Sequence, residues 1–244
     1  EDRGELNAEF DDLITIDDIV AELHAHTTAS DGHLEMSQLV GLAKERGFHT
    51  IAVTDHSRSE IQANGLSDER LLAQIEQVRE LDTITKGIKI LAGSEVGILA
   101  DGTLDYDEET LAALDHVVAS PHVALKQDTK TCTKRLIKAI EHPAVRILGH
   151  PTGRLIGRRP GLEPAMDEII AAAKQHDVAL EINAHWMRLD LRDSHVRAAV
   201  DAGALIAINC DVHAEDHFDN LRYGILTARR GWLKPEQCIN CWPA

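Results

Sequence analysis

Short apolar runs alternate with longer amphipathic stretches along almost the whole chain. Seven runs are rich in Leu, Ile, Val and Ala and are too short for isolated helices, so they predict strands. These runs cover residues 19–26, 50–56, 88–98, 116–122, 145–152, 178–185 and 205–213. Between them, apolar residues recur at helical spacing and predict helices over 36–47, 66–87, 133–143, 164–177, 194–203 and 216–231.

Repeated alternation of strand and helix predicts an α/β fold with a parallel sheet. The near-equal size of the seven units favours a barrel over an open sheet. Residues 1–18 do not follow the pattern and are interpreted as a linker or the remnant of a preceding domain. Residues 19–244 are expected to form a single domain.

Composition and charge narrow the class of protein. Hydrophobic residues make up 43% of the chain and aromatic residues only 3%, which predicts an aliphatic core. No apolar run approaches the ~20 residues of a membrane helix, and the acidic N-terminus does not resemble a signal peptide, so a cytoplasmic protein is expected. The formal net charge of −16 argues against nucleic-acid binding by bulk positive charge. The pair Cys238 and Cys241 has no second pair at zinc-ribbon spacing and is interpreted as two ordinary cysteines, with structural zinc binding or redox use as a minority interpretation.

Polar residues of one chemical kind stand at the ends of the predicted strands. In parallel α/β folds the functional site lies at the carboxyl ends of the strands. Six of the seven ends supply residues that commonly bind metals: His24, His26 and Asp31; His56; Glu95; His122; His150; and Asp211 and His213.

Each of these residues alone is more often structural. A lone histidine at a strand end is usually a hydrogen-bonded residue, and Asp31 in Ser-Asp-Gly reads by default as a turn residue. The structural interpretation would, however, have to hold at six strand ends at once. Burying so many imidazoles and carboxylates without a cation is also costly.

The kind and number of ligands indicate more than one metal ion. Imidazole and carboxylate without thiolate suit Mn²⁺, Fe²⁺ or Zn²⁺ in catalytic sites. Nine ligands are too many for one ion, whereas two or three ions with a bridging carboxylate such as Glu95 fit the count. Such clusters generate a bound hydroxide and stabilise in-line attack on phosphorus.

The motifs resemble those of a known family. HAHTTASDG, VTDHS, GSEVGI, SPH, GHP and NCDVH, in this order at the strand ends, are similar to the PHP (polymerase and histidinol phosphatase) domain. GHPTGRLIGRR, EINAHWMRLDLRD and ARRGWL further resemble the C-terminal PHP domain of bacterial family-X DNA polymerases. The resemblance covers about residues 19–244. It departs at Gly97, where the family often has Asp, and at His185 and Trp186, where it often has proline.

The resemblance implies a fold, an activity and a set of ligands. It implies a distorted seven-stranded (β/α)7 barrel of TIM-like kind, with a trinuclear metal site at the carboxyl ends of the strands. It also implies hydrolysis of phosphodiester bonds in DNA, as a 3′→5′ exonuclease or with 3′-phosphatase or abasic-site activity, and a polymerase domain in the full-length protein. The implied ligand groups are His24, His26, Glu95 and Asp211; Asp31, His56 and His213; and Glu95, His122 and His150.

Arginines after the fifth and sixth strands are candidates for contact with substrate. Asp31, Glu95 and Asp211 are expected to be catalytic through the metals. Arg154 and Arg188 are expected to act in catalysis and, together with Arg158, to grip substrate phosphates; Arg159 and Arg192 lie in the same loops. For each arginine, surface charge is an equally good interpretation. Two alternatives stay open: a small-molecule phosphatase of histidinol-phosphate type and a non-catalytic module.

Overall fold

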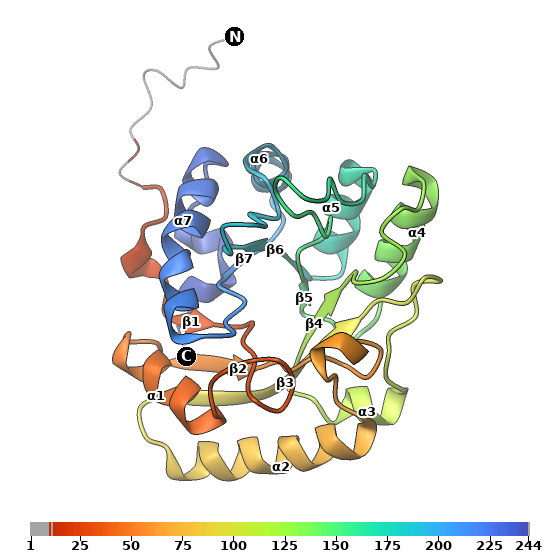
Figure 1. Ribbon diagram of the computed structural model, residues 1–244. Coiled ribbons are helices and arrows are strands. Elements are labelled where there is room, and N and C mark those ends of the chain that lie inside the picture. Colours follow the sequence, from red (N-terminus) through yellow and green to blue (C-terminus); the bar gives the residue numbers. More distant parts are fainter. Residues whose placement is uncertain (1–9, 11, 244) are drawn as a thin grey trace.

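Seven parallel strands form a nearly closed barrel with helices around its outside (Figure 1). The computed structural model describes residues 10 and 12–243. The strands pair in chain order, each with the next. Their bounds are β1 Ala21–Glu22, β2 Thr50–Val53, β3 Lys89–Gly97, β4 His116–Ser120, β5 Ile147–Leu148, β6 Ala179–Asn183 and β7 Ile206–Asn209. The predicted seven-stranded α/β barrel is confirmed.

One α-helix follows each strand. The helices are α1 Met36–Glu45, α2 Asp68–Ile84, α3 Glu108–Ala112, α4 Thr129–Ile140, α5 Met166–Gln175, α6 Asp193–Ala202 and α7 Leu221–Arg230. The short 3-10 helices are η2 Ile16–Asp18, η3 Ile61–Ala63, η4 Glu215–Asn220, η5 Pro235–Gln237 and η6 Ile239–Cys241. Side chains of Ser67, Asp107 and Asp128 cap α2, α3 and α4 by accepting backbone N–H groups. The sequence analysis missed α3, because five residues are too few to show a helical period.

The first strand is much shorter than its apolar run predicts. Strand pairing stops after Glu22, because the backbone N–H groups beyond it donate hydrogen bonds to side chains and not to a neighbouring strand. Leu23 N–H donates to Asn209 Oδ1 at 3.3 Å, and Ala25 N–H donates to Thr54 Oγ1 at 2.9 Å. His24 and His26 therefore stand on an irregular segment beyond β1 and not on a strand face.

The barrel closes between its first and last strands in two ways. At the carboxyl rim, His26 N–H donates to Val212 O at 2.7 Å and Val212 N–H donates to His24 O at 3.1 Å. At the opposite end the C-terminal segment lies between β1 and β7. There Asn240 donates to Ala21 O at 3.0 Å and accepts from Ile208 N–H at 2.8 Å. The hydrogen bonds at the carboxyl rim fix the segment that carries His24 and His26.

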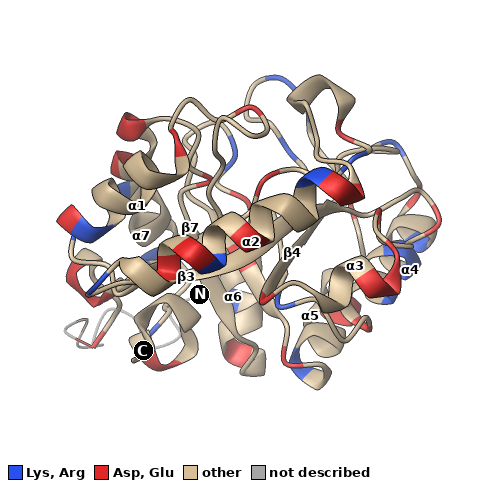
Figure 2. Cartoon of the chain, turned by 90° about the horizontal axis from the view of Figure 1, so that it is seen from below, with Lys and Arg blue, Asp and Glu red and all other residues tan. Residues whose placement is uncertain are grey.

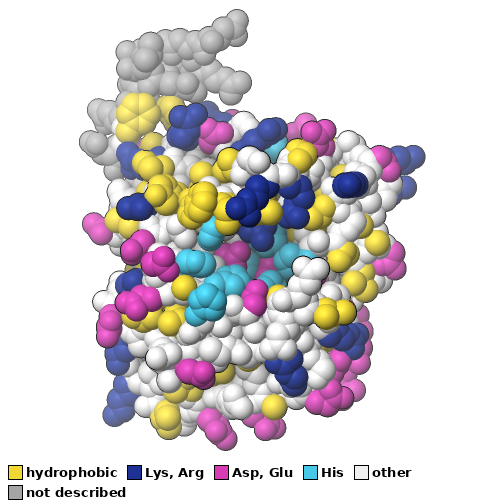
Figure 3. Space-filling model, viewed as in Figure 1, with side chains coloured by type: hydrophobic (Ala, Val, Ile, Leu, Met, Phe, Trp, Pro, Cys, Tyr) yellow, Lys and Arg dark blue, Asp and Glu magenta, His cyan; other side chains and the backbone are white. Residues whose placement is uncertain are grey.

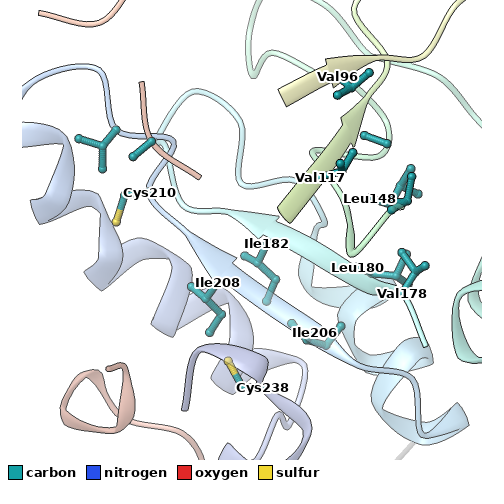
Figure 4. Packing of buried hydrophobic residues seen from close by; sticks show 14 of the residues in the cluster. Val96, Val117, Leu148, Val178, Leu180, Ile182, Ile206, Ile208, Cys210 and Cys238 are labelled. Atoms are coloured by element: carbon teal, nitrogen blue, oxygen red, sulfur yellow. The ribbon is translucent and has the colours of Figure 1, made fainter. Parts of the chain in front are cut away.

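Two apolar cores hold the barrel together. The larger core fills the layer between strands and helices, where Val96, Ile182 and Ile208 belong to the same cluster (Figure 4). The smaller core comes from six different strands or their ends and so faces the barrel axis. Its members are Ala21, Leu23, Ala52, Val118, Ile147, Ala179 and Ala207. Most of these side chains are small. The polar residues described below lie beyond them, toward the carboxyl ends of the strands.

The segment before β1 packs against the barrel in its described part. Ile14 is fully buried, and its N–H donates to Leu233 O at 3.0 Å. Arg229 donates to the carbonyls of Leu13 and Ile14. The interpretation of residues 1–18 as a linker falls partly on residues 1–9 and 11, which lie outside the described residues. It stays a prediction.

Acidic and basic residues are interspersed along the outer helices and the connecting loops (Figure 2). Among the residues described, no helix combines the length and the apolar character needed to cross a membrane. All four cysteines are free, and Cys238 is buried beside the C-terminal closure.

Candidate metal centre

All nine candidate ligands meet in one hollow at the carboxyl ends of the strands. Figure 3 shows histidines surrounding acidic side chains there, with basic side chains directly beside them. His24, His26, Glu95 and His150 are almost fully buried, whereas Asp31 and His213 lie nearer the opening. The structure thus brings together residues that are as much as 189 positions apart, since the hollow contains both His24 and His213.

One group of four donor atoms lies at the bottom of the hollow. His26 Nε2 is 3.1 Å from Asp211 Oδ1, and His24 Nε2 is 3.3 Å from Glu95 Oε2. His26 Nε2 is also 3.5 Å from Glu95 Oε2. All four atoms are buried and lack a hydrogen-bond partner within the described part of the chain. Orphaned buried donors and acceptors that converge in this way are what a cation site requires.

A second group lies toward the opening. Asp31 Oδ1 is 3.2 Å from His213 Nε2 and 3.5 Å from His56 Nε2. His26 is close enough to contribute to this group as well, because its ring stacks between those of His56 and His213 at centroid distances of 4.3 and 4.2 Å. His26 therefore borders both groups.

A third group surrounds the other oxygen of Glu95. Glu95 Oε1 is 2.8 Å from His150 Nε2 and 3.1 Å from His122 Nε2. His56 Nδ1 approaches Glu95 Oε2 at 2.9 Å. Glu95 is thus the carboxylate common to the first and third groups, as expected of a bridging ligand. The geometry also places His56 with Glu95 and His122, which the resemblance did not imply.

The carboxylates in the hollow are held in the ionised form that binds cations. Burial alone would raise the pKa of Glu95 and Asp211, but surrounding histidines hold both values well below the usual range. Burial lowers the pKa of His24, yet nearby carboxylates, Glu181 foremost, outweigh burial and raise it well above its ordinary value. The pKa of His213 reaches about 9, because Asp31 and Asp211 outweigh its burial. The carboxylates are therefore ionised at neutral pH, and positive charge gathers around them. These residues fit a group of divalent ions.

Backbone conformation and buried hydrogen bonds place several ligands. Asp211 and His150 have φ angles of 54° and 23°, a region that residues other than glycine rarely occupy outside functional sites. Gly32 lets the loop after His26 turn tightly, since an added Cβ would lie 2.5 Å from His26 O. Asp55 anchors the same loop by accepting from Thr27 N–H at 2.8 Å. Asp31 is thus carried on a fixed loop.

Two residues of β6 support the ligands, and the sequence analysis did not single them out. Glu181 is fully buried and accepts from His24 Nδ1 at 2.8 Å, which turns His24 Nε2 toward the hollow. Its other oxygen accepts from His150 N–H at 2.7 Å. Asn183 donates to Asp211 Oδ2 at 2.9 Å. A carboxylate that orients a metal-binding histidine fixes the tautomer of that histidine. In the sequence, Glu181 and Asn183 stand two residues apart inside an apolar run, and this pattern could have identified them.

Three further polar residues border the hollow. Glu60 Oε1 lies 3.5 Å from His122 Nδ1. The rings of His185 and His217 lie 5.3 Å apart, and His217 lies 6.0 Å from His213. Glu60 and His217 lie outside the predicted strand ends, so the search for metal ligands at strand ends did not find them. His185 ends the predicted run 178–185 but was considered only as a departure from the family.

The candidate arginines differ in their positions. Arg188 Nε is 3.7 Å from Asp211 Oδ2, at the edge of the cluster. Arg154 instead donates Nε to Arg188 O at 2.8 Å and another N–H to Leu189 O, so it braces the neighbouring loop. Arg159 lines a pocket of about 510 Å³ together with His122 and Lys126. Arg158 and Arg192 are exposed: Arg158 lines a pocket formed by residues 154–160, and Arg192 contacts His195 at 2.9 Å.

Comparisons with known proteins identify the family of the chain. Residues 22–185 match the PHP domain. The chain is 40% identical over 229 residues to the DNA polymerase/3'-5' exonuclease PolX of Bacillus subtilis, covering 94% of this chain but only 40% of that protein. It is 31% identical over 234 residues to a probable phosphatase of Shewanella sediminis, covering 92% and 90% of the two chains. The histidinol phosphate phosphatase of Lactococcus lactis, crystallised with zinc, L-histidinol and phosphate, has a TM-score of 0.60 at 14% identity, over 87% and 94% of the chains.

The chain belongs to the PHP family. The family match covers well over half of the chain, and the residues that it covers include seven of the nine candidate ligands. The expected class, a metal-dependent hydrolase of phosphoester bonds, is confirmed at this level.

Proposed function

We propose that this chain hydrolyses phosphodiester bonds of DNA from the 3′ end, with three divalent ions held in the hollow. The observation that carries the proposal is that two donor groups share Glu95 through its two oxygens and the third adjoins them through His26 and His56, with Arg188 at the edge. Such a cluster beside a guanidinium suits a substrate phosphate. Mn²⁺, Zn²⁺ and Fe²⁺ all suit the imidazole and carboxylate donors.

The residues divide into ligands and substrate contacts. His24, His26, Glu95 and Asp211 would hold one ion; Asp31, His56 and His213 a second; and Glu95, His122 and His150 a third. When bound, the ions supply Lewis acidity toward phosphate oxygens and lower the pKa of coordinated water. The chain itself orients His24 through Glu181 and keeps the carboxylates ionised. Arg188, from the loop after β6, is placed to hold a non-bridging phosphate oxygen.

A polymeric anion is favoured over a small one by the surroundings of the hollow. The chain as a whole is acidic, but basic side chains gather beside the histidines in Figure 3. Arg159 and Lys126 line the pocket that runs from His122, so positive charge extends beyond one phosphate. The 40% identity to a protein named as a polymerase and 3'-5' exonuclease points the same way. A polymerase domain as partner in a longer protein is part of the proposal.

A phosphatase acting on small monoesters is the second candidate. Its support is the likeness to a probable phosphatase over nearly its whole length and to a histidinol phosphate phosphatase in fold. A non-catalytic module ranks last, because all nine ligand positions keep residues that bind metals.

A comparison of substrates tests the proposal. A 5′-labelled single-stranded oligonucleotide and a panel of phosphate monoesters, histidinol phosphate included, would be incubated with the protein and Mn²⁺, Zn²⁺ or Fe²⁺. Successive shortening of the oligonucleotide with slow monoester turnover is expected. Fast monoester turnover with an intact oligonucleotide would instead identify the phosphatase, and inactivity on both with a metal-to-protein ratio well below two would identify the inactive module.

A further inference from the structure

Trp186 is an exposed tryptophan at the rim of the hollow. It is 58% exposed, although tryptophan is among the residues that folded proteins bury most on average. It lies in the loop between β6 and α6, two residues before Arg188. The ligands of the hollow do not account for an exposed indole at this position.

The loop that carries Trp186 is held in place on both sides. Arg188 N–H donates to His185 O at 2.7 Å, and Asn183 N–H donates to Asp190 O at 2.6 Å. Ile156 N–H, from the loop after β5, donates to Met187 O at 2.7 Å. Trp186 is therefore presented on a rigid support, which lowers the entropic cost of binding a ligand.

Aromatic rings connect Trp186 to the metal centre. The Trp186 ring stacks on His185, with centroids 5.7 Å apart and planes at 24°. His185 contacts His217 at 5.3 Å, and His217 contacts the candidate ligand His213 at 6.0 Å. One face of the indole is thus supported by an imidazole, and the side chain lies only a few ring widths from the cluster.

We propose that Trp186 is a stacking platform for a nucleobase that flanks the scissile phosphate, while Arg188 holds that phosphate. This inference rests on the proposed function and adds the class of substrate: single-stranded ends whose bases are unpaired. Every base offers a π face, so stacking accepts any sequence, and a cation beside the platform holds the backbone. Ile156, on the neighbouring loop that bonds to Met187, is a second exposed apolar residue, with 50% of its surface accessible.

A double-mutant cycle between protein and oligonucleotide tests the platform. Binding of the full chain with Mn²⁺ would be measured for the wild type, Trp186→Ala and Trp186→Phe. The probes are a phosphorothioate-linked oligonucleotide and matched oligonucleotides with abasic residues at each of the three 3′-terminal positions. Trp242→Ala is the matched control, because Trp242 is 43% exposed but contacts Glu236 and His49 at the opposite end of the barrel.

The cycle predicts a coupled loss. Trp186→Ala should weaken binding of the full oligonucleotide about 5- to 150-fold, since each stacked base contributes about that factor, and Trp186→Phe should restore much of it. One abasic oligonucleotide should bind the wild type as weakly as Trp186→Ala binds the full one, with no further loss in combination. The control Trp242→Ala should bind every probe as tightly as the wild type does.

The contrary outcomes distinguish failure of the Trp186 platform from failure of the proposed function. Equal binding by the wild type and Trp186→Ala, or additive losses with every abasic probe, would overturn the platform while oligonucleotide hydrolysis by the wild type still supports the proposed function. Lack of oligonucleotide hydrolysis by the wild type, with monoester turnover intact, would overturn the proposed function itself.

Discussion

Glu181 offers the sharpest test of how the barrel prepares its histidines. Its Oε1 accepts from His24 Nδ1 at 2.8 Å and its Oε2 accepts from His150 N–H at 2.7 Å. In Glu181→Gln the carbonyl oxygen can keep the hydrogen bond from the His150 amide, while the NH₂ group that replaces Oε1 loses the donor Asn209 Nδ2, which reaches Oε1 at 2.8 Å. The new NH₂ group then faces His24 Nδ1 and forces the imidazole proton onto Nε2, the atom that points into the hollow.

The expected cost is a 10- to 100-fold weaker affinity for the ion near His24, about 1.4 to 2.7 kcal/mol. One effect opposes it. The charge of Glu181 helps to raise the pKa of His24, so its removal also reduces competition from protons. Because that competition fades at alkaline pH, the loss of affinity should grow as pH rises. A purely structural defect would not show this trend.

The assay is calorimetric titration with Mn²⁺ at neutral and alkaline pH, with thermal melting in chelator as a check on folding. Glu22→Gln is the matched control, since Glu22 is also buried and accepts from His24 N–H at 3.1 Å. Burial raises the pKa of Glu22 to about 8, so this carboxyl is largely protonated at neutral pH and glutamine should replace it with little effect. Wild-type affinity in Glu181→Gln, or an equal loss in Glu22→Gln, would refute the reasoning.

Three other outcomes are expected. Metal binding at neutral pH should release protons and should become stronger toward pH 9. The reason is that neighbouring carboxylates raise the pKa of His213 to about 9 despite its burial, whereas a histidine must be neutral to bind a metal ion. Equal binding enthalpies in buffers of different ionisation enthalpy would contradict this. Arg188→Ala should raise KM for an oligonucleotide about tenfold or more, with Arg188→Lys only partly active, in steady-state kinetics. Gly149→Ala should lower the free energy of unfolding by about 1 to 3 kcal/mol in urea, since its Cβ would lie 2.3 Å from Ser120 Oγ, whereas Gly41→Ala, with open space around it, should not.

Chain periodicity was enough to predict the barrel, and strand-end chemistry was enough to predict which side chains meet in the hollow; their role as metal ligands stays a prediction. All seven apolar runs contain a strand of the barrel. The nine candidate ligands lie together because parallel strands bring their carboxyl ends to one rim of the barrel. Strand lengths were overestimated, since side chains such as Asn209 and Thr54 replace strand partners beyond Glu22 and no period records that exchange.

The supporting residues depend on tertiary contacts that no local pattern contains. Glu181 is far from His24 in sequence, and only the closed barrel places their side chains 2.8 Å apart. The arginine assignments show the same limit. Loop position alone made Arg154 and Arg188 equivalent, but backbone carbonyls occupy Arg154, while Arg188 reaches the ligand Asp211. Their roles in catalysis stay predictions until tested.

The central claim is that the ligand cluster performs phosphodiester hydrolysis. The most direct measurement is the rate at which the wild type and His24→Ala shorten a 5′-labelled single-stranded oligonucleotide with Mn²⁺, with His49→Ala as a control at the opposite end of the barrel. The account predicts shortening from the 3′ end by the wild type and His49→Ala, and loss of it in a folded His24→Ala. Equal rates for the wild type and His24→Ala would contradict the account.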